Sequence, residues 1–62
     1  MEVLVYNKGK LAKKFWGDIV CSFDLKTHEF VVESQSGKKL YGAQVKMANE
    51  SSVDGVISVY EE

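Results

Sequence analysis

The chain has 62 residues, of which 45% are hydrophobic, and it carries eight lysines, no arginine and nine acidic residues, for a net charge of −1. This length allows one domain, residues 1–62, and the apolar fraction is that of a globular chain and excludes a disordered one. The single cysteine, Cys21, excludes an internal disulfide, and no apolar run reaches the roughly 18 residues of a membrane span. Because the first residues also lack the pattern of a signal peptide, we expect one cytoplasmic domain that does not enter a membrane.

Charge follows the chain in alternating blocks. Residues 1–16 carry a net charge of +3, residues 17–34 of −3, residues 35–49 of +3 and residues 50–62 of −4. Such alternation favours strands whose opposite charges meet across a sheet, and it argues against one continuous basic surface.

The two ends of the chain predict strands. EVLVY (2–6) and VISVY (56–60) are both rich in β-branched and aromatic residues. Their similarity suits a barrel in which the terminal strands pair. YNKGK (6–10) predicts a type I turn whose glycine takes the left-handed conformation of a G1 bulge, and SQSGK (34–38) repeats that pattern.

Residues 8–16 fit two structures. As a helix, they gather Leu11, Phe15 and Trp16 into one apolar stripe, with Asn7 as the N-cap. As a strand, they make use of the preceding turn and place Phe15 and Trp16 on opposite faces. The helix would be short and would hold lysines at the positive end of its dipole. We therefore favour the strand and keep the short helix as the alternative.

Three further segments alternate with the period of a strand. They are DIVCSFD (18–24), EFVVES (29–34) and KLYGAQVKM (39–47). The last of them places Tyr41, Ala43, Val45 and Met47 on one face. Between the strands we expect a short polar link, DLKTHE (24–29), and a longer loop, NESSVDGV (49–56), which closes on an Asp-Gly turn.

The sequence therefore predicts a mostly β domain of five to six short strands, with or without one short helix near residues 8–16. A single two-sided sheet of this size exposes too much apolar surface. We expect it to curl into a small SH3-like or OB-like barrel or a curled meander, or to pair with a second copy of the chain. An architecture of this kind does not itself specify a function.

No catalytic or metal-binding pattern accompanies these strands. The single histidine, His28, lies in a predicted turn, and Cys21 lies on an inward face. Nucleophilic catalysis needs a base and an orienting group beside the nucleophile. Cys21, Asp24, His28 and Glu29 have no recognised metal-ligand spacing, and no phosphate-binding glycine motif is present. We expect no enzyme, no metal and no cofactor.

Nucleic-acid binding is the alternative function. Lys8, Lys10, Lys38 and Lys39 belong to the two lysine-bearing turns, and small β-barrels contact phosphates with lysine and stack bases on aromatic rings. These lysines converge only if both turns lie at the same end of the barrel. The chain has no arginine and is acidic overall, whereas nucleic-acid-binding domains are commonly basic. A weak, sequence-tolerant nucleic-acid binder therefore ranks second.

Protein binding is the function that the composition favours. Seven aromatic residues are more than the core of so short a chain hides, and aromatic residues ringed by charges are typical of interface hot spots. We predict a non-catalytic module of the adaptor or inhibitor type that binds another protein, a second copy of the chain included. The predicted partner-binding residues are Phe15, Trp16, Tyr41, Lys13 and Lys14, with Trp16 at the centre.

Overall fold

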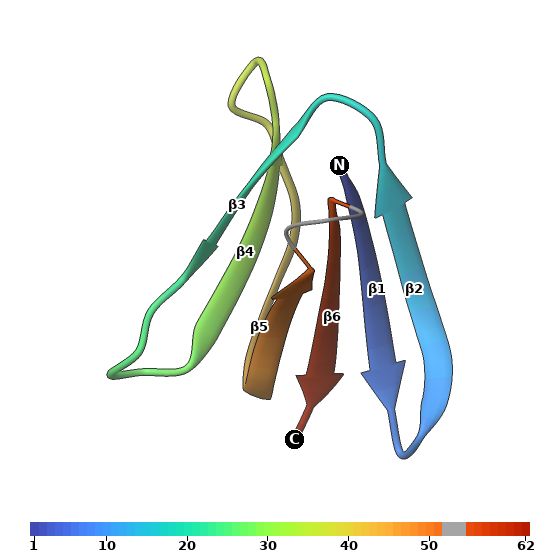
Figure 1. Cartoon of the computed structure of the whole chain (residues 1–62). Helices are drawn as coiled ribbons and strands as arrows, with labels where there is room; N and C mark the ends of the chain where they lie inside the picture. The colour runs from blue at the N-terminus through green and yellow to red at the C-terminus, as the bar shows by residue number, and fades with distance from the viewer. Residues whose placement is uncertain (52–54) are drawn as a thin grey trace.

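The structure is a computed structural model that describes residues 1–51 and 55–62, and it consists of strands and turns (Figure 1). The six strands are β1 (Glu2–Asn7), β2 (Lys10–Trp16), β3 (Ile19–Phe23), β4 (Glu29–Ser34), β5 (Lys39–Ser51) and β6 (Val56–Glu61). The described part of the chain contains no helix. The prediction of a mostly β domain of five to six strands is confirmed, and residues 10–16 form β2 where the short helix was the alternative.

One sheet contains all six strands, in the order β2-β1-β6-β5-β4-β3. β1 and β6 are parallel neighbours, with Val3 opposite Ile57 and Val5 opposite Val59, and every other neighbouring pair is antiparallel. The predicted pairing of the terminal strands is therefore confirmed. The β1–β6 pair lies in the middle of the β2-β1-β6-β5 half of the sheet, so hydrogen bonds between the two ends of the chain hold this half together.

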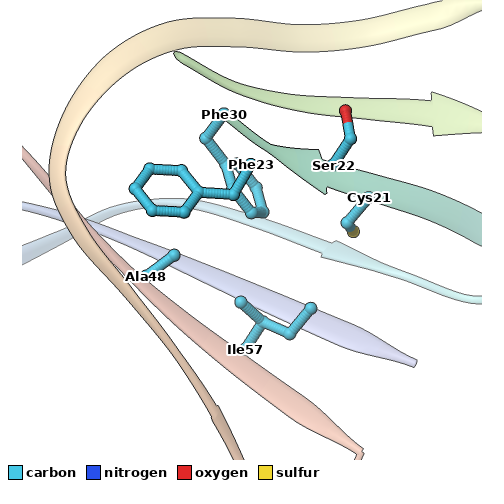
Figure 2. Close-up of a pocket in the computed structure, with 6 residues that line it drawn as sticks. All are labelled: Cys21, Ser22, Phe23, Phe30, Ala48 and Ile57. Carbon is cyan, nitrogen blue, oxygen red and sulfur yellow. The ribbon is translucent and has the colours of Figure 1, made fainter. Parts of the chain in front are cut away.

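β5 folds this sheet over on itself. Its first part pairs with β4, as far as Gln44 opposite Glu29, and its second part pairs with β6, starting at Val45 opposite Glu61. The strand turns sharply between these two parts (Figure 2). His28 holds the bend, because its carbonyl accepts the amide of Val45 at 2.9 Å and its ring Nδ1 lies 3.2 Å from the carbonyl oxygen of Val45.

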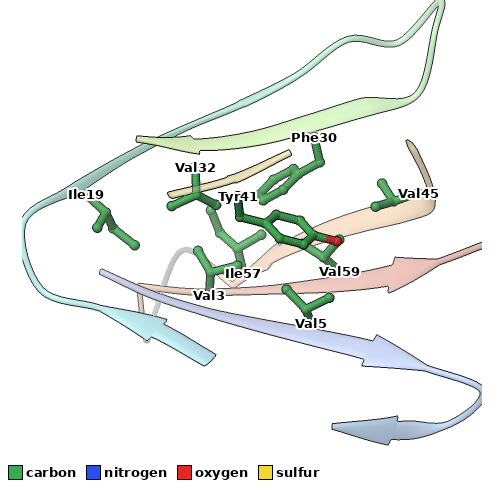
Figure 3. Packing of buried hydrophobic residues seen from close by; sticks show 9 residues of the cluster. All are labelled: Val3, Val5, Ile19, Phe30, Val32, Tyr41, Val45, Ile57 and Val59. Atoms are coloured by element: carbon green, nitrogen blue, oxygen red, sulfur yellow. The ribbon is translucent and has the colours of Figure 1, made fainter. Parts of the chain in front are cut away.

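The core fills the space between the two halves of the folded sheet (Figure 3). Alternating positions of five strands supply it, because every second side chain of a strand points to the same face. Fully burying one such side chain contributes roughly 1.5–3 kcal/mol. The buried residues are Val3, Val5, Ile19, Phe30, Val32, Tyr41, Val45, Ile57 and Val59.

The sheet is not closed into a barrel. β2 and β3 are its two edge strands, and Gly17 and Asp18 connect them in the sequence. Lysines on β2 protect that edge from pairing with other chains. The SH3-like and OB-like arrangements stay predictions.

The two glycine turns differ from each other. In the turn after Asn7, Lys8 and Gly9 have φ values of 52° and 79°, and Asn7 pairs with Lys10. Two positive φ values are those of a type I′ turn, so the predicted type I turn with a G1 bulge is wrong here. I′ geometry follows the right-handed twist of the flanking strands better than type I does.

The second glycine turn has the predicted form. The amide of Gly37 donates to the carbonyl of Ser34 at 2.9 Å, and Gly37 takes the left-handed conformation with a φ of 92°. The loop expected from residue 49 is shorter than predicted, because β5 continues to Ser51. Residues 52–54 of that predicted loop, with the aspartate of its Asp-Gly turn, lie outside the described residues.

Candidate protein-binding face

One side of the β2-β1-β6-β5 half points away from the core. Because Val3, Val5, Ile57 and Val59 are buried, the residues between them on β1 and β6 face outward. Side chains opposite each other on neighbouring strands share a face, which extends this surface onto β2 and β5. We call it the outer face, and it comprises Glu2, Leu4, Tyr6, Leu11, Lys14, Trp16, Met47, Asn49, Val56, Ser58 and Tyr60.

Trp16 is the most exposed aromatic residue of the outer face. Its side chain is 69% exposed, and the Lys14 ammonium lies 5.9 Å from the centroid of its ring. The same ammonium lies 3.4 Å from the Glu2 carboxylate. Exposed pairs of these kinds contribute at most about 1 kcal/mol each to stability. The contact with Lys14 therefore stabilises the position of Trp16 only weakly, and most of the indole ring is exposed to solvent.

A second apolar group lies across the other end of the outer face. Tyr6 and Tyr60 stack with ring centroids 5.3 Å apart and an interplanar angle of 16°. Leu11 lies opposite Tyr6 and Met47 opposite Tyr60, and these two side chains are 53% and 48% exposed. The outer face therefore combines large apolar side chains that the core does not use.

The structure divides the predicted partner-binding residues between two faces. Trp16 and Lys14 lie on the outer face, whereas Phe15 points inward from β2 and its ring centroid lies 5.6 Å from that of Tyr41. The Lys13 ammonium lies 5.4 Å from the centroid of the Tyr41 ring. Phe15, Tyr41 and Lys13 therefore form a separate group on the inner side, where they join β2 to β5.

Tyr41 is a buried side chain with a satisfied hydroxyl group. Its O–H donates to Glu61 at 2.5 Å, and Asn7 Nδ2 donates to the other oxygen of the same carboxylate at 3.1 Å. Burial, and then the hydrogen bond to Glu61 and its negative charge, raise the pKa of Tyr41 well above its usual value of 10.0. These contacts give Tyr41 a structural role.

Met47 and Leu11 were not predicted as surface residues of the site. The alternation of residues 39–47 placed Met47 on the same face as Tyr41 and Val45, and this prediction is wrong. A register shift between Val45 and Met47 reverses the alternation, so that Ala48 packs against the core and Met47 faces outward. A second shift, between Val5 and Tyr6, brings Leu11 opposite Tyr6. Such bulges depend on the partner strand and leave no signal in a period-two pattern.

The two lysine-bearing turns lie at opposite ends of the folded sheet. Lys8 and Lys10 follow the last residue of β1. Lys38 and Lys39 follow β4, whose last residue, Ser34, pairs with Ile19. That end of β3 adjoins the start of β1, because Gly17 donates its amide to the Met1 carbonyl at 3.1 Å. A strand of this length spans about 20 Å, so the four lysines do not converge (Figure 1).

An apolar cleft of about 260 Å³ lies on the inner side, beside β3 (Figure 2). Its lining contains no charged side chain, and it consists of Cys21, Ser22, Phe23, Phe30, Ala48 and Ile57. No group of three metal-ligating side chains occurs in residues 1–51 and 55–62. His28 is exposed in its turn, as expected, and Asp24 accepts the amides of Lys26 and Thr27, which lower the pKa of its carboxyl group.

The described part of the chain has no helix with the length and hydrophobicity of a membrane span. Comparison of the chain with protein-family models, with curated proteins and with solved structures finds no match.

Proposed function

We propose that this chain is a non-catalytic protein-binding module of the adaptor or inhibitor type, which binds its partner through the outer face. One observation carries the proposal: the only tryptophan of the chain is 69% exposed on β2, whose opposite face packs against the core through Phe15. Tryptophan and tyrosine dominate the binding energy of protein interfaces, where they lie within a rim of polar residues.

The geometry of the outer face supports this use. Trp16 lies near one end and the Tyr6–Tyr60 stack near the other, and Leu4 pairs with Lys14 between them. All of these side chains stand on hydrogen-bonded strands, so little conformational freedom is lost when a partner binds. Phe15, Tyr41 and Lys13 contribute indirectly, by holding β2 from the inner side.

A cytoplasmic location, a second copy of the chain as the partner, and weak nucleic-acid binding through the turn lysines stay predictions. The separation of the two lysine-bearing turns favours protein over nucleic acid, because the four lysines do not gather into one basic patch that neutralises neighbouring phosphates.

The test is affinity capture from a lysate of the cells in which the protein occurs, with and without nuclease. Wild type is compared with Trp16→Ala and with Leu25→Ala. Leu25 is the matched control, because it is 80% exposed but lies in the turn after β3, away from the outer face. We expect nuclease-resistant proteins that wild type and Leu25→Ala retain and Trp16→Ala loses.

Capture that Trp16→Ala leaves unchanged contradicts the proposal. Material that is lost with nuclease points to the nucleic-acid alternative. Self-association is read separately from the molar mass in solution, and a dimer that Trp16→Ala dissociates identifies a second copy as the partner.

A further inference from the structure

The outer face ends in a groove of about 290 Å³, where the turn after β1, the bend of β5 and the end of β6 meet. The Tyr6–Tyr60 stack and Met47 supply its apolar surface. Sites for small organic ligands usually enclose about 300–1,000 Å³. This smaller, open groove has the size for one or two side chains of a bound polypeptide. Its lining residues are Tyr6, Lys8, Gly9, Lys46, Met47, Tyr60 and Glu61.

The groove carries positive charge. Lys8 and Lys46 line it, and neither forms an ion pair with a described residue. The carboxylate of Glu61 also lines it and accepts hydrogen bonds from Tyr41 and from Asn7, which are neutral donors, so the lining keeps a net charge of +1. The two ammonium groups are therefore available to an incoming anion.

We infer that this groove binds a segment of the partner in which an apolar side chain is flanked by acidic residues. The apolar side chain would pack against Tyr60 and Met47, and the flanking carboxylates would approach Lys8 and Lys46. A basic segment is disfavoured, because its charges would meet the same two lysines without compensation. This inference rests on the proposed function, since it names the chemistry of the partner that the outer face receives.

The test measures the binding of labelled peptides by fluorescence anisotropy. The peptides are short, acetylated and amidated, and each contains Phe-Leu flanked by aspartates, by asparagines or by lysines. Two exposed ion pairs favour the acidic peptide over the neutral one by about fivefold at low ionic strength. We expect this preference to shrink at about 0.5 M salt, where exposed charges are screened, and the basic peptide to bind most weakly.

Charge reversal locates the effect. In the Lys8→Glu plus Lys46→Glu variant, we expect the basic peptide to bind more tightly than the acidic one. The control, Lys38→Glu plus Lys39→Glu, makes the same change of charge at the other end of the sheet and should keep the acidic preference within about twofold. Lys8→Asn plus Lys46→Gln removes the charges with residues that suit the fold, since asparagine tolerates the left-handed backbone of Lys8. It should equalise the acidic and neutral peptides.

The inference is overturned if the neutral peptide binds as tightly as the acidic one, or if the control variant loses the preference as well. It is also overturned if the acidic peptide shows no saturation up to about 1 mM. Competition by single-stranded DNA at the same lysines would assign the groove to nucleic acid instead. If the peptides show no charge preference but capture from the lysate still depends on Trp16, only this inference is refuted. If capture does not depend on Trp16, the proposed function is refuted.

Discussion

Tyr41 shows how a single polar group is accommodated in a core this small. The side chain is only 6% exposed, and its hydroxyl donates to a carboxylate that Asn7 also binds. A buried hydroxyl without a partner costs about 1–3 kcal/mol, so the position of Glu61 near the end of β6 stabilises the packing of Tyr41. Burial and this contact make the stability of the fold depend on alkaline pH, because they raise the pKa of Tyr41.

We expect Tyr41→Phe to lower the free energy of unfolding by about 1–2 kcal/mol at neutral pH, through loss of the hydrogen bond to Glu61. Below pH 10 both the folded and the unfolded chain keep this phenol protonated. Above pH 10 the unfolded chain releases its proton first, since the pKa of Tyr41 is raised in the folded state. Stability of wild type therefore falls as pH rises beyond 10, and the difference from Tyr41→Phe shrinks.

Urea titrations at a series of pH values from neutral to about 11 measure this difference. Glu61→Gln serves as the second variant, because it removes the negative charge and keeps an acceptor for the hydroxyl. It should weaken the alkaline loss of stability. A difference between wild type and Tyr41→Phe that is constant across the whole range would refute the coupling of Tyr41 to Glu61.

Lys8 is strained by its turn. Its φ of 52° lies in the left-handed region, which asparagine and glycine adopt more readily than lysine. We expect Lys8→Asn to raise the free energy of unfolding by about 0.5–1 kcal/mol. Lys10→Asn is the control, since it makes the same chemical change in β2, where asparagine is disfavoured. Destabilisation by Lys8→Asn would show that the turn does not have the I′ form.

At the scale of elements, the two faces of β2 have different roles: one packs against the core and the other carries the proposed binding surface. Phe15 packs inward against Tyr41, and Trp16 points into solvent from the next position. The sequence predicted that these two residues lie on opposite faces if the segment is a strand. It favoured the strand over the helix only through the preceding turn, the short length and the helix dipole, because the apolar residues of 11–16 fit both periods. Pairing with β1, a contact made across the turn, settles the choice.

We expect Trp16→Ala to change the free energy of unfolding by no more than about 1 kcal/mol, because the ring is mostly exposed. Phe30→Ala should cost about 3–5 kcal/mol, since that ring is 2% exposed in the centre of the core. A chain of this length has a total stability of roughly 3–9 kcal/mol, so Phe30→Ala removes at least about a third of it. Chemical denaturation measures both, and a loss above 2 kcal/mol for Trp16→Ala would assign the tryptophan to the core.

The predictability of the elements differs along the chain. Regular alternation and turn residues were enough to predict β3 and β4, and the similarity of the two terminal segments predicted their pairing. The two register shifts were not predictable, because each is decided by the strand that pairs there. The prediction for Trp16 did not depend on these shifts, whereas Met47 was grouped with Tyr41 and Val45, which lie on the opposite face. Tyr41 was placed in the site because sequence alone does not show which aromatic ring the core needs.

The whole molecule depends on contacts between distant parts of the chain. β6 lies between β1 and β5, so the central strands of one half of the sheet come from both ends of the sequence. Closing so long a loop has an entropic cost that must be met before native contacts compensate for it. The sequence contains no proline, so no slow isomerisation of an X-Pro bond accompanies this step.

We therefore expect refolding in a single phase on the millisecond-to-second timescale, as in other small all-β domains. Stopped-flow measurement of Trp16 fluorescence follows this process, and circular dichroism at the same denaturant concentrations provides the control. A further phase of tens of seconds would contradict the expected two-state folding.

The outer face is most directly tested by mapping where the partner binds. In a ¹⁵N-labelled chain titrated with a captured partner, we expect the amide shifts to change along β2, β1 and β6, with the Trp16 indole N–H among the largest changes. The cleft beside β3, lined by Cys21 and Phe23, lies on the other side of the sheet and should change little. Changes confined to that cleft, with the Trp16 indole signal unmoved, would contradict binding through the outer face.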